Sequence, residues 1–264
     1  FPLLLTCAMP PFTGRSTTAP SPPPALTTFK VLTFDCYGTL IDWERGIINA
    51  LAEAGYVTEG KEGELLALFS RLESPVQAEF PTLLYPQVLE KVLEKMVAER
   101  LPENGKATQE TFRKFGESIG NWPAFPDSAQ ALQYLQQHFK LVIFSNVDRE
   151  SFAKSQARLG VTFDMIVTAQ DVGSYKPEHG HFNHGLKQIE EKWGYSKAQV
   201  LHTFQSLYHD AVPANELQIA TAHINRAPLA ASGGATPTPK FAPDLDYQYS
   251  TLEELAQAHR AASQ

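Results

Sequence analysis

The chain contains little cysteine and no long apolar segment. Cys7 and Cys36 are the only cysteines among 264 residues, too few for a disulfide scaffold or a zinc site built from cysteines. We therefore expect a reducing compartment and a cytoplasmic protein. No apolar run approaches the roughly 18 residues that a transmembrane helix needs, so we expect no membrane partner.

Positive charge is also scarce. The sequence has 22 Lys and Arg against 29 Asp and Glu, a formal net charge of −7, and it contains no run of five or more basic residues. Proteins that bind nucleic acid without sequence preference displace counterions with clustered Lys and Arg. The composition therefore argues against a nucleic-acid partner.

Proline is distributed unevenly along the chain. Seven of the 19 prolines lie before residue 25, in a stretch rich in Ser and Thr. Such composition is typical of flexible, extended segments. We predict that residues 1–28 form a flexible leader without a catalytic role.

Short β-branched and apolar runs alternate with helical patterns over the rest of the chain. This alternation predicts an α/β fold, a doubly wound parallel sheet. Between the first two strands the spacing of apolar residues is helical from about residue 46 to 123, which predicts an inserted helical cap. We expect the α/β core to comprise 29–45 and 124–264. The predicted strands are 30–35, 140–145, 163–169, 199–204 and 218–225.

Polar residues follow these predicted strands. In open α/β sheets, ligands bind at the carboxyl ends of the strands near the topological switch point. This rule directs attention to the residues just beyond each strand. They are Asp35, Ser145, Asn146, Lys176, Gln205, Ser206 and Asp210.

Four short segments resemble the motifs of the haloacid dehalogenase superfamily, in the family's order. They are FDCYGTL at 34–40, SN at 145–146, YKP at 175–177 and QSLYHD at 205–210. The resemblance covers most of 29–226 and implies a Rossmann-like core with a helical cap. It implies a hydrolase that uses an aspartate nucleophile and binds a small anionic substrate, and it is compatible with a homodimer.

The resemblance assigns roles to the matching residues. Asp35 would be the nucleophile, forming a covalent aspartyl ester that water later hydrolyses. Lys176 would keep Asp35 ionised, and Asp210 would orient Lys176 or the attacking water. Ser145 is expected to act with these catalytic residues. The expected substrate-binding residues are Tyr37, Thr39, Asn146, Gln205 and Ser206.

Position 37 separates two branches of the superfamily. Its phosphatases have a second Asp there, because an alkoxide leaving group needs a proton donor. Tyr37 is instead what the 2-haloacid dehalogenase branch shows, and a halide needs no proton. Phosphatase relatives also supply an acidic metal ligand where this chain has Gln205. We therefore expect no required cofactor, with Mg²⁺ at Asp35, Tyr37 and Asp210 only if the protein is a phosphatase.

The carboxylate of a 2-haloacid can be held by an arginine from the cap. Arg71 is the first candidate, because it lies on the helix face opposite Leu65 and Leu72, and Arg45 is the second. The match is incomplete, since Phe182 and Leu207 stand where the dehalogenases have Tyr and Asn. The leading interpretation is hydrolytic dehalogenation of a 2-haloacid or similar small carboxylate. The alternatives are a Mg²⁺-dependent phosphatase and a non-catalytic binding module.

Overall fold

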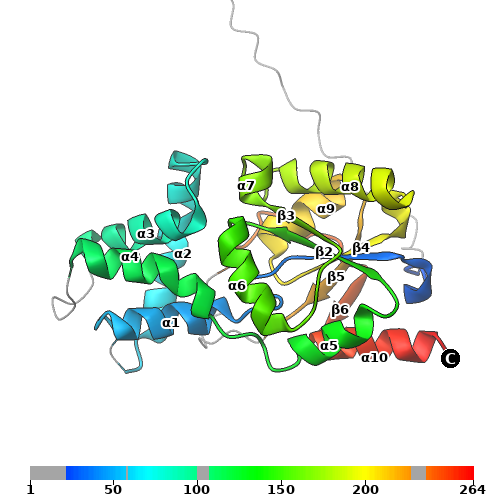
Figure 1. Cartoon of the computed structure of the whole chain (residues 1–264), viewed down its shortest axis with the longest axis horizontal. Coiled ribbons are helices and arrows are strands. Elements are labelled where there is room, and N and C mark those ends of the chain that lie inside the picture. Colours follow the sequence, from blue (N-terminus) through cyan, green and yellow to red (C-terminus); the bar gives the residue numbers. More distant parts are fainter. Residues whose placement is uncertain (1–21, 58, 100–106, 227–235) are drawn as a thin grey trace, which may run out of the picture.

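The computed structural model describes residues 22–57, 59–99, 107–226 and 236–264 (Figure 1). A six-stranded, wholly parallel sheet lies at the centre, in the order β3-β2-β1-β4-β5-β6. Five of the strands were predicted from the sequence, and the structure adds a short sixth at one edge. The strands are β1 Val31–Phe34, β2 Lys140–Ser145, β3 Met165–Thr168, β4 Val200–Phe204, β5 Ala220–Ile224 and β6 Tyr247–Tyr249.

Helices cover both faces of the sheet. Successive side chains of a strand point to opposite faces, so Val31 packs in one apolar cluster and Leu32 in another. The cluster that holds Val31 includes residues of α8 and α9, whereas the cluster that holds Leu32 includes residues of α5, α6 and α10. This arrangement confirms the predicted doubly wound α/β fold. The core helices are α5 Ser128–Leu135, α6 Arg149–Leu159, α7 Ala169–Val172, α8 Gly180–Trp193, α9 Val212–Glu216 and α10 Leu252–Ala262.

The helical cap is a separate layer at the side of the sheet, shown in blue, cyan and green at the left of Figure 1. Its residues follow β1 and return to the core before α5. Apolar side chains of α2 and α3, such as Phe69 and Val92, are fully buried. The expected boundary at residue 46 falls inside α1, which begins at Trp43. The cap helices are α1 Trp43–Glu53, α2 Glu62–Glu79, α3 Tyr85–Glu99, α4 Gln109–Glu117 and the 3-10 helix η2 Ser118–Asn121.

The two segments that connect the cap to the core lie side by side, and we call them the neck (40–42 and 123–125). Ile41 and Ala124 form an antiparallel bridge. The N–H of Asp42 donates to the carbonyl of Pro123 at 2.8 Å, and the N–H of Phe125 donates to that of Leu40 at 3.0 Å. The chain therefore leaves and re-enters the core at one place, next to the end of β1.

Part of the expected leader belongs to the folded core. The first 21 residues of the expected segment 1–28 lie outside the described residues. Leu26, in the 3-10 helix η1 (Leu26–Thr28), is 5% exposed and belongs to the main apolar cluster. The element η1 packs against α10 at the other end of the chain. None of the helices described is long and apolar enough to cross a membrane.

Candidate active site

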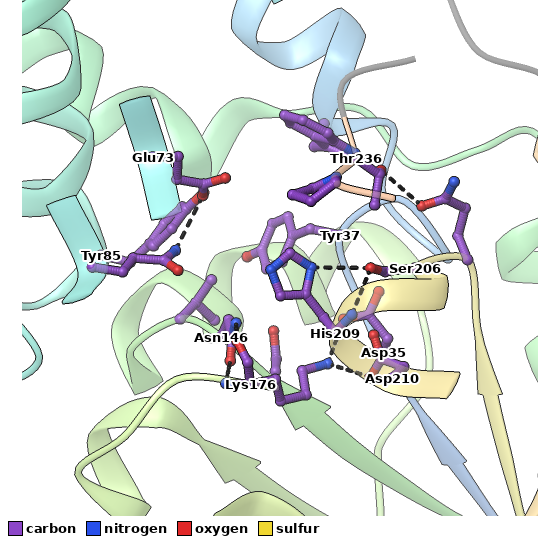
Figure 2. Close-up of a pocket in the computed structure, with 16 residues that line it drawn as sticks. Asp35, Tyr37, Glu73, Tyr85, Asn146, Lys176, Ser206, His209, Asp210 and Thr236 are labelled. Carbon is purple, nitrogen blue, oxygen red and sulfur yellow. Dashed lines mark hydrogen bonds and ion pairs between the residues drawn. The ribbon is translucent and has the colours of Figure 1, made fainter. Parts of the chain in front are cut away.

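A cavity of about 70 Å³ lies between the cap and the carboxyl ends of β1, β2 and β4 (Figure 2). The switch point of the sheet is the boundary between β1 and β4, because the chain turns from one side of β1 to the other there. The core side of the cavity is lined by Asp35, Tyr37, Ser145, Asn146, Val147, Lys176, Gln205, Ser206, His209, Asp210, Thr236 and Pro237. The cap side is lined by Trp43, Glu73, Gln77 and Tyr85.

Asp35 follows β1 directly, and both of its carboxylate oxygens are held. Lys176 Nζ donates to Oδ1 at 2.8 Å, and Thr39 Oγ1 donates to Oδ2 at 2.9 Å. The Thr39 hydroxyl can contact Asp35 because the loop turns at Gly38. The backbone there has φ +96°, a conformation that favours glycine. Burial raises the pKa of Asp35 above its usual value, and the Lys176 ammonium acts against this rise. Thr39 thus positions Asp35 and does not line the cavity.

Lys176 is buried, and its ammonium group makes three hydrogen bonds. They go to Asp35 Oδ1, to Asp210 Oδ1 at 2.7 Å and to the carbonyl of Phe144 at 2.9 Å. Burial would lower the pKa of Lys176, but the adjacent Asp210 and Asp35 carboxylates outweigh this and raise it. Since an ammonium has three donors, all of its protons are used.

Asp210 is completely buried beside Lys176. Its Oδ1 also accepts a hydrogen bond from His202 Nε2 at 3.0 Å, and His202 Nδ1 accepts one from Thr33 at 2.8 Å. Burial would raise the pKa of Asp210, but Lys176 and His202 together lower it. Asp210 Oδ2 and Ser145 Oγ are buried and have no hydrogen-bond partner among the described groups. Both residues line the cavity, and a pair of unpartnered oxygens is unusual because buried polar groups are normally hydrogen-bonded.

The other expected binding residues are held within the site. Asn146 accepts a hydrogen bond from the Lys176 N–H at 2.7 Å and donates to the Lys176 carbonyl at 3.0 Å, so its amide positions the lysine. Gln205 Oε1 accepts a hydrogen bond from Thr236 at 3.1 Å. Ser206 Oγ accepts from the backbone N–H of His209 at 3.0 Å.

Tyr37 lines the cavity, but its hydroxyl group is paired with Ser155 in α6, at 2.8 Å. Burial raises the pKa of Tyr37 well above its usual value. The Tyr37 phenol is therefore a poor proton donor for a leaving group. Phe182, one of the departures from the family pattern, packs under the sheet against Phe144 and His202 and does not line the cavity.

The structure does not place the two candidate arginines at the cavity. Arg71 points away from it, and its guanidinium is 61% exposed and paired with Glu99 of α3 at 2.6 Å. Arg45 is 55% exposed and paired with Asp42 at the start of α1. The helical pattern correctly put Arg71 opposite the buried face of α2. The buried face packs against other cap helices and also reaches the cavity, so the exposed face that carries Arg71 lies away from the cavity.

Sequence reasoning missed the residues that the cap does contribute. Glu73 lies in α2, where it accepts hydrogen bonds from the Tyr85 hydroxyl and from Gln77 Nε2. The sequence did contain a signal for Glu73, because its spacing puts this acidic residue on the same helix face as the apolar residues Leu66, Phe69 and Val76. His209 was missed as well, and burial lowers its pKa to about 4, so the ring is neutral near pH 7.

The residues named for a metal do not fit Mg²⁺ in this arrangement. The Lys176 ammonium lies between the Asp35 and Asp210 carboxylates. A divalent cation bound by these two carboxylates would lie close to the ammonium, and the two positive charges would repel each other. Tyr37 offers no free hydroxyl. Among the residues described, no group of three or more His, Cys, Asp or Glu is arranged to hold a metal ion.

Comparison with known proteins identifies the family. A model of the haloacid dehalogenase-like hydrolases matches residues 29–202, which include the motifs that supply Asp35, Ser145, Asn146 and Lys176. The chain belongs to this hydrolase family. No curated protein matches the sequence of this family member.

Solved structures share the fold of this haloacid dehalogenase-like hydrolase. The L-2-haloacid dehalogenase from Xanthobacter autotrophicus is 20% identical, with a TM-score of 0.69 over 88% of this chain and 99% of that one. The same enzyme with chloropropionic acid covalently bound gives 20% identity and a TM-score of 0.67, over 88% and 98%. A putative HAD-hydrolase from Bacillus subtilis bound to magnesium is 18% identical, with a TM-score of 0.66 over 88% and 99%. The cap and core therefore follow an established arrangement.

Proposed function

We propose that this hydrolase displaces a leaving group from carbon with Asp35 as the nucleophile, acting on a 2-haloacid or a similar small carboxylate. An Asp35 oxygen forms a bond to the substrate carbon, and the carbon–halogen bond breaks with its electron pair leaving on the halide. Water then attacks the carbonyl of the aspartyl ester, releasing the hydroxy acid and restoring Asp35. The proposed reaction requires no cofactor.

The observation that carries this proposal is the engagement of Tyr37 with Ser155. At the position where a phosphatase of the family places its acid, this chain has a phenol that is already paired and has a raised pKa. A halide can leave without taking up a proton, whereas an alkoxide leaving group needs a proton donor. The site therefore favours a leaving group that needs no acid at this position.

The remaining polar groups support the same reaction. Lys176 and Thr39 fix the Asp35 carboxylate, so little reorganisation is needed before attack. The unpaired Ser145 hydroxyl suits the single carboxylate of the substrate, and Asp210 Oδ2 suits the water of the second step. The covalent chloropropionic acid complex of the Xanthobacter enzyme is consistent with such an intermediate in this fold.

A single turnover in H₂¹⁸O tests the proposal. Excess protein is incubated with racemic 2-chloropropionate in the presence of a chelator, and the peptide that contains Asp35 is examined by mass spectrometry. We expect ¹⁸O in the Asp35 carboxylate and one chloride released per turnover. Asp35→Asn is expected to abolish both signals, whereas Asp244→Asn, a matched change at an exposed position, retains them.

Two outcomes would overturn the proposal. The release of inorganic phosphate from an aryl phosphate, dependent on Mg²⁺ and lost in Asp35→Asn, would identify a phosphatase. The absence of label from Asp35 with every substrate of a broad panel would indicate a binding module.

A further inference from the structure

The cap contributes a carboxyl group to the cavity. Glu73 lies on the cap side with Gln77 and Tyr85, opposite Asp35 and Lys176 on the core side (Figure 2). Its Oε1 accepts hydrogen bonds from both the Tyr85 hydroxyl and Gln77 Nε2, the latter at 3.2 Å. Two donors on one oxygen fix the orientation of the carboxyl group and leave Oε2 without a hydrogen-bond partner among the described residues.

No positive charge offsets Glu73 on this side of the cavity. Lys176 is the only Lys or Arg among the described residues that line the cavity, and its three protons are used by Asp35, Asp210 and Phe144. Arg71 and Arg45 are paired at the protein surface. A substrate group that approaches Glu73 therefore meets an unopposed hydrogen-bond acceptor.

We propose that Glu73 determines substrate specificity, and that it selects substrates that carry an ammonium group at the end remote from Asp35. The proposal deepens the function proposed above and rests on it. The substrate is then a small zwitterion, whose carboxylate lies near Ser145 on the core side and whose ammonium contacts Glu73 Oε2. The Glu73 carboxylate would repel a substrate with a second carboxylate at the remote end. A cap that supplied an arginine at this place would have the opposite preference.

The ionisation of Glu73 supports this assignment. Burial raises the pKa of Glu73 to about 7, although the hydrogen bond from Tyr85 acts to lower it. The phenols of Tyr85 and of Tyr175, from the loop after α7, interact with it, and burial raises the pKa of both. Both phenols stay neutral at pH 8, whereas Glu73 is ionised. His209 and Tyr37 line the same cavity, and burial lowers the pKa of His209 to about 4 and raises that of Tyr37, so both are neutral as well. The preference for an ammonium should therefore be strongest above pH 7 and weaker at pH 5.5.

Binding of two unreactive carboxylates tests the selection independently of chemistry. The compounds are 4-aminobutanoate and pentanoate, which differ by an ammonium in place of a methyl group. We expect calorimetry at pH 8 to show that the wild-type protein binds the amino compound about tenfold more tightly or better, the effect of one favourable ion pair. Glu73→Gln should remove this preference, and Glu64→Gln, the same change at an exposed position of α2, should keep it.

Reaction of the corresponding 2-chloro acids separates this inference from the proposed function. We expect 4-amino-2-chlorobutanoate to label Asp35 faster than 2-chloropentanoate in the wild type and at a similar rate in Glu73→Gln. Selective binding without labelling by either acid would refute the dehalogenation and leave the specificity role supported. An equal ratio of dissociation constants in the wild type and Glu73→Gln, or no binding of either compound to the wild type, would overturn the specificity role.

Discussion

Two buried carboxylates share one ammonium in the active site. Lys176 contacts Asp35 and Asp210, and His202 supplies a further donor to Asp210. The pKa of Asp210 is lowered while that of Asp35 is raised, although both face the same lysine. His202 further lowers the pKa of Asp210, whereas the negative charge of Asp210 helps to raise that of Asp35, in which the hydrogen bond from Thr39 acts the other way. Two chemically identical groups in contact with the same lysine therefore differ in how readily they lose a proton, and Asp210 is the more strongly acidic of the two.

Glu73 should make the stability of the protein depend on pH. Its pKa is about 7 in the folded protein against a reference of 4.5, so the folded state holds this proton more tightly. Stability from this group is present below pH 4.5 and is lost as the pH rises through 7, by up to about 3 kcal/mol at 1.36 kcal/mol per pKa unit. Urea unfolding of Glu73→Gln should show stability similar to that of the wild type at pH 4.5 and higher at pH 8. A constant difference between the two proteins across this range would contradict the assignment of a raised pKa.

At the scale of elements, Trp122 joins the cap to the core. Its ring lies edge-on to Tyr37 of the core at 5.7 Å and to Tyr85 of α3 at 6.5 Å, measured between ring centroids. Gly46 of α1 packs directly against the indole. The Tyr175 hydroxyl of the core donates to the Leu83 carbonyl between α2 and α3, at 2.8 Å, and forms a second connection. The position of the cap wall, and of Glu73 on it, depends on these contacts.

Gly46→Ala should destabilise this junction. A Cβ at Gly46 would lie 2.2 Å from Trp122 Cγ, so the ring or the helix must move. Overpacking of this kind costs about 1–3 kcal/mol, to be measured by urea unfolding. In a double-mutant cycle, Trp122→Leu creates space, and the combined variant should lose less stability than the sum of the two single variants. Strict additivity would show that the methyl group does not meet the indole.

Much of the site was predictable because it follows from local pattern. Asp35 and Ser145 end β-branched or apolar runs, and parallel strands bring such ends together. The cap was less predictable, because its helical periodicity gives a buried face but not what that face packs against. Arg71 was therefore misplaced and Glu73 overlooked. The three-residue β6, with only Tyr247, Gln248 and Tyr249, is too short for its alternation to be distinguished from a loop.

At the scale of the whole molecule, the two ends of the described chain stabilise each other. Leu26 packs in the main apolar cluster with residues of α10, and the Tyr247 hydroxyl donates to the Pro24 carbonyl. Phe29 packs edge-on to the ring of Tyr247, with centroids 6.3 Å apart. Residues just before β1 thus contact β6, the last strand of the sheet, through the side chain of Tyr247.

Leu26→Ala should destabilise the whole protein, even though Leu26 lies in a segment whose composition predicts flexibility. Removal of a buried leucine side chain costs about 2–5 kcal/mol. For a domain of this size, each kcal/mol corresponds to a fall in Tm of about 2–4 °C, measurable by calorimetry. Thr27→Ala, at an exposed neighbouring residue, is the control and should leave Tm nearly unchanged. Equal Tm values for wild type and Leu26→Ala would show that η1 does not contribute to the core.

The neck has a consequence for how this protein could acquire new specificity. Because Ile41 and Ala124 are bridged, the whole insert spans two points that are already neighbours in the core. The sheet, with Asp35, Lys176 and Asp210, needs no rearrangement to accommodate a longer, shorter or different insert. Evolution, or an engineer, can therefore exchange the cap as one cassette while the core keeps its fold.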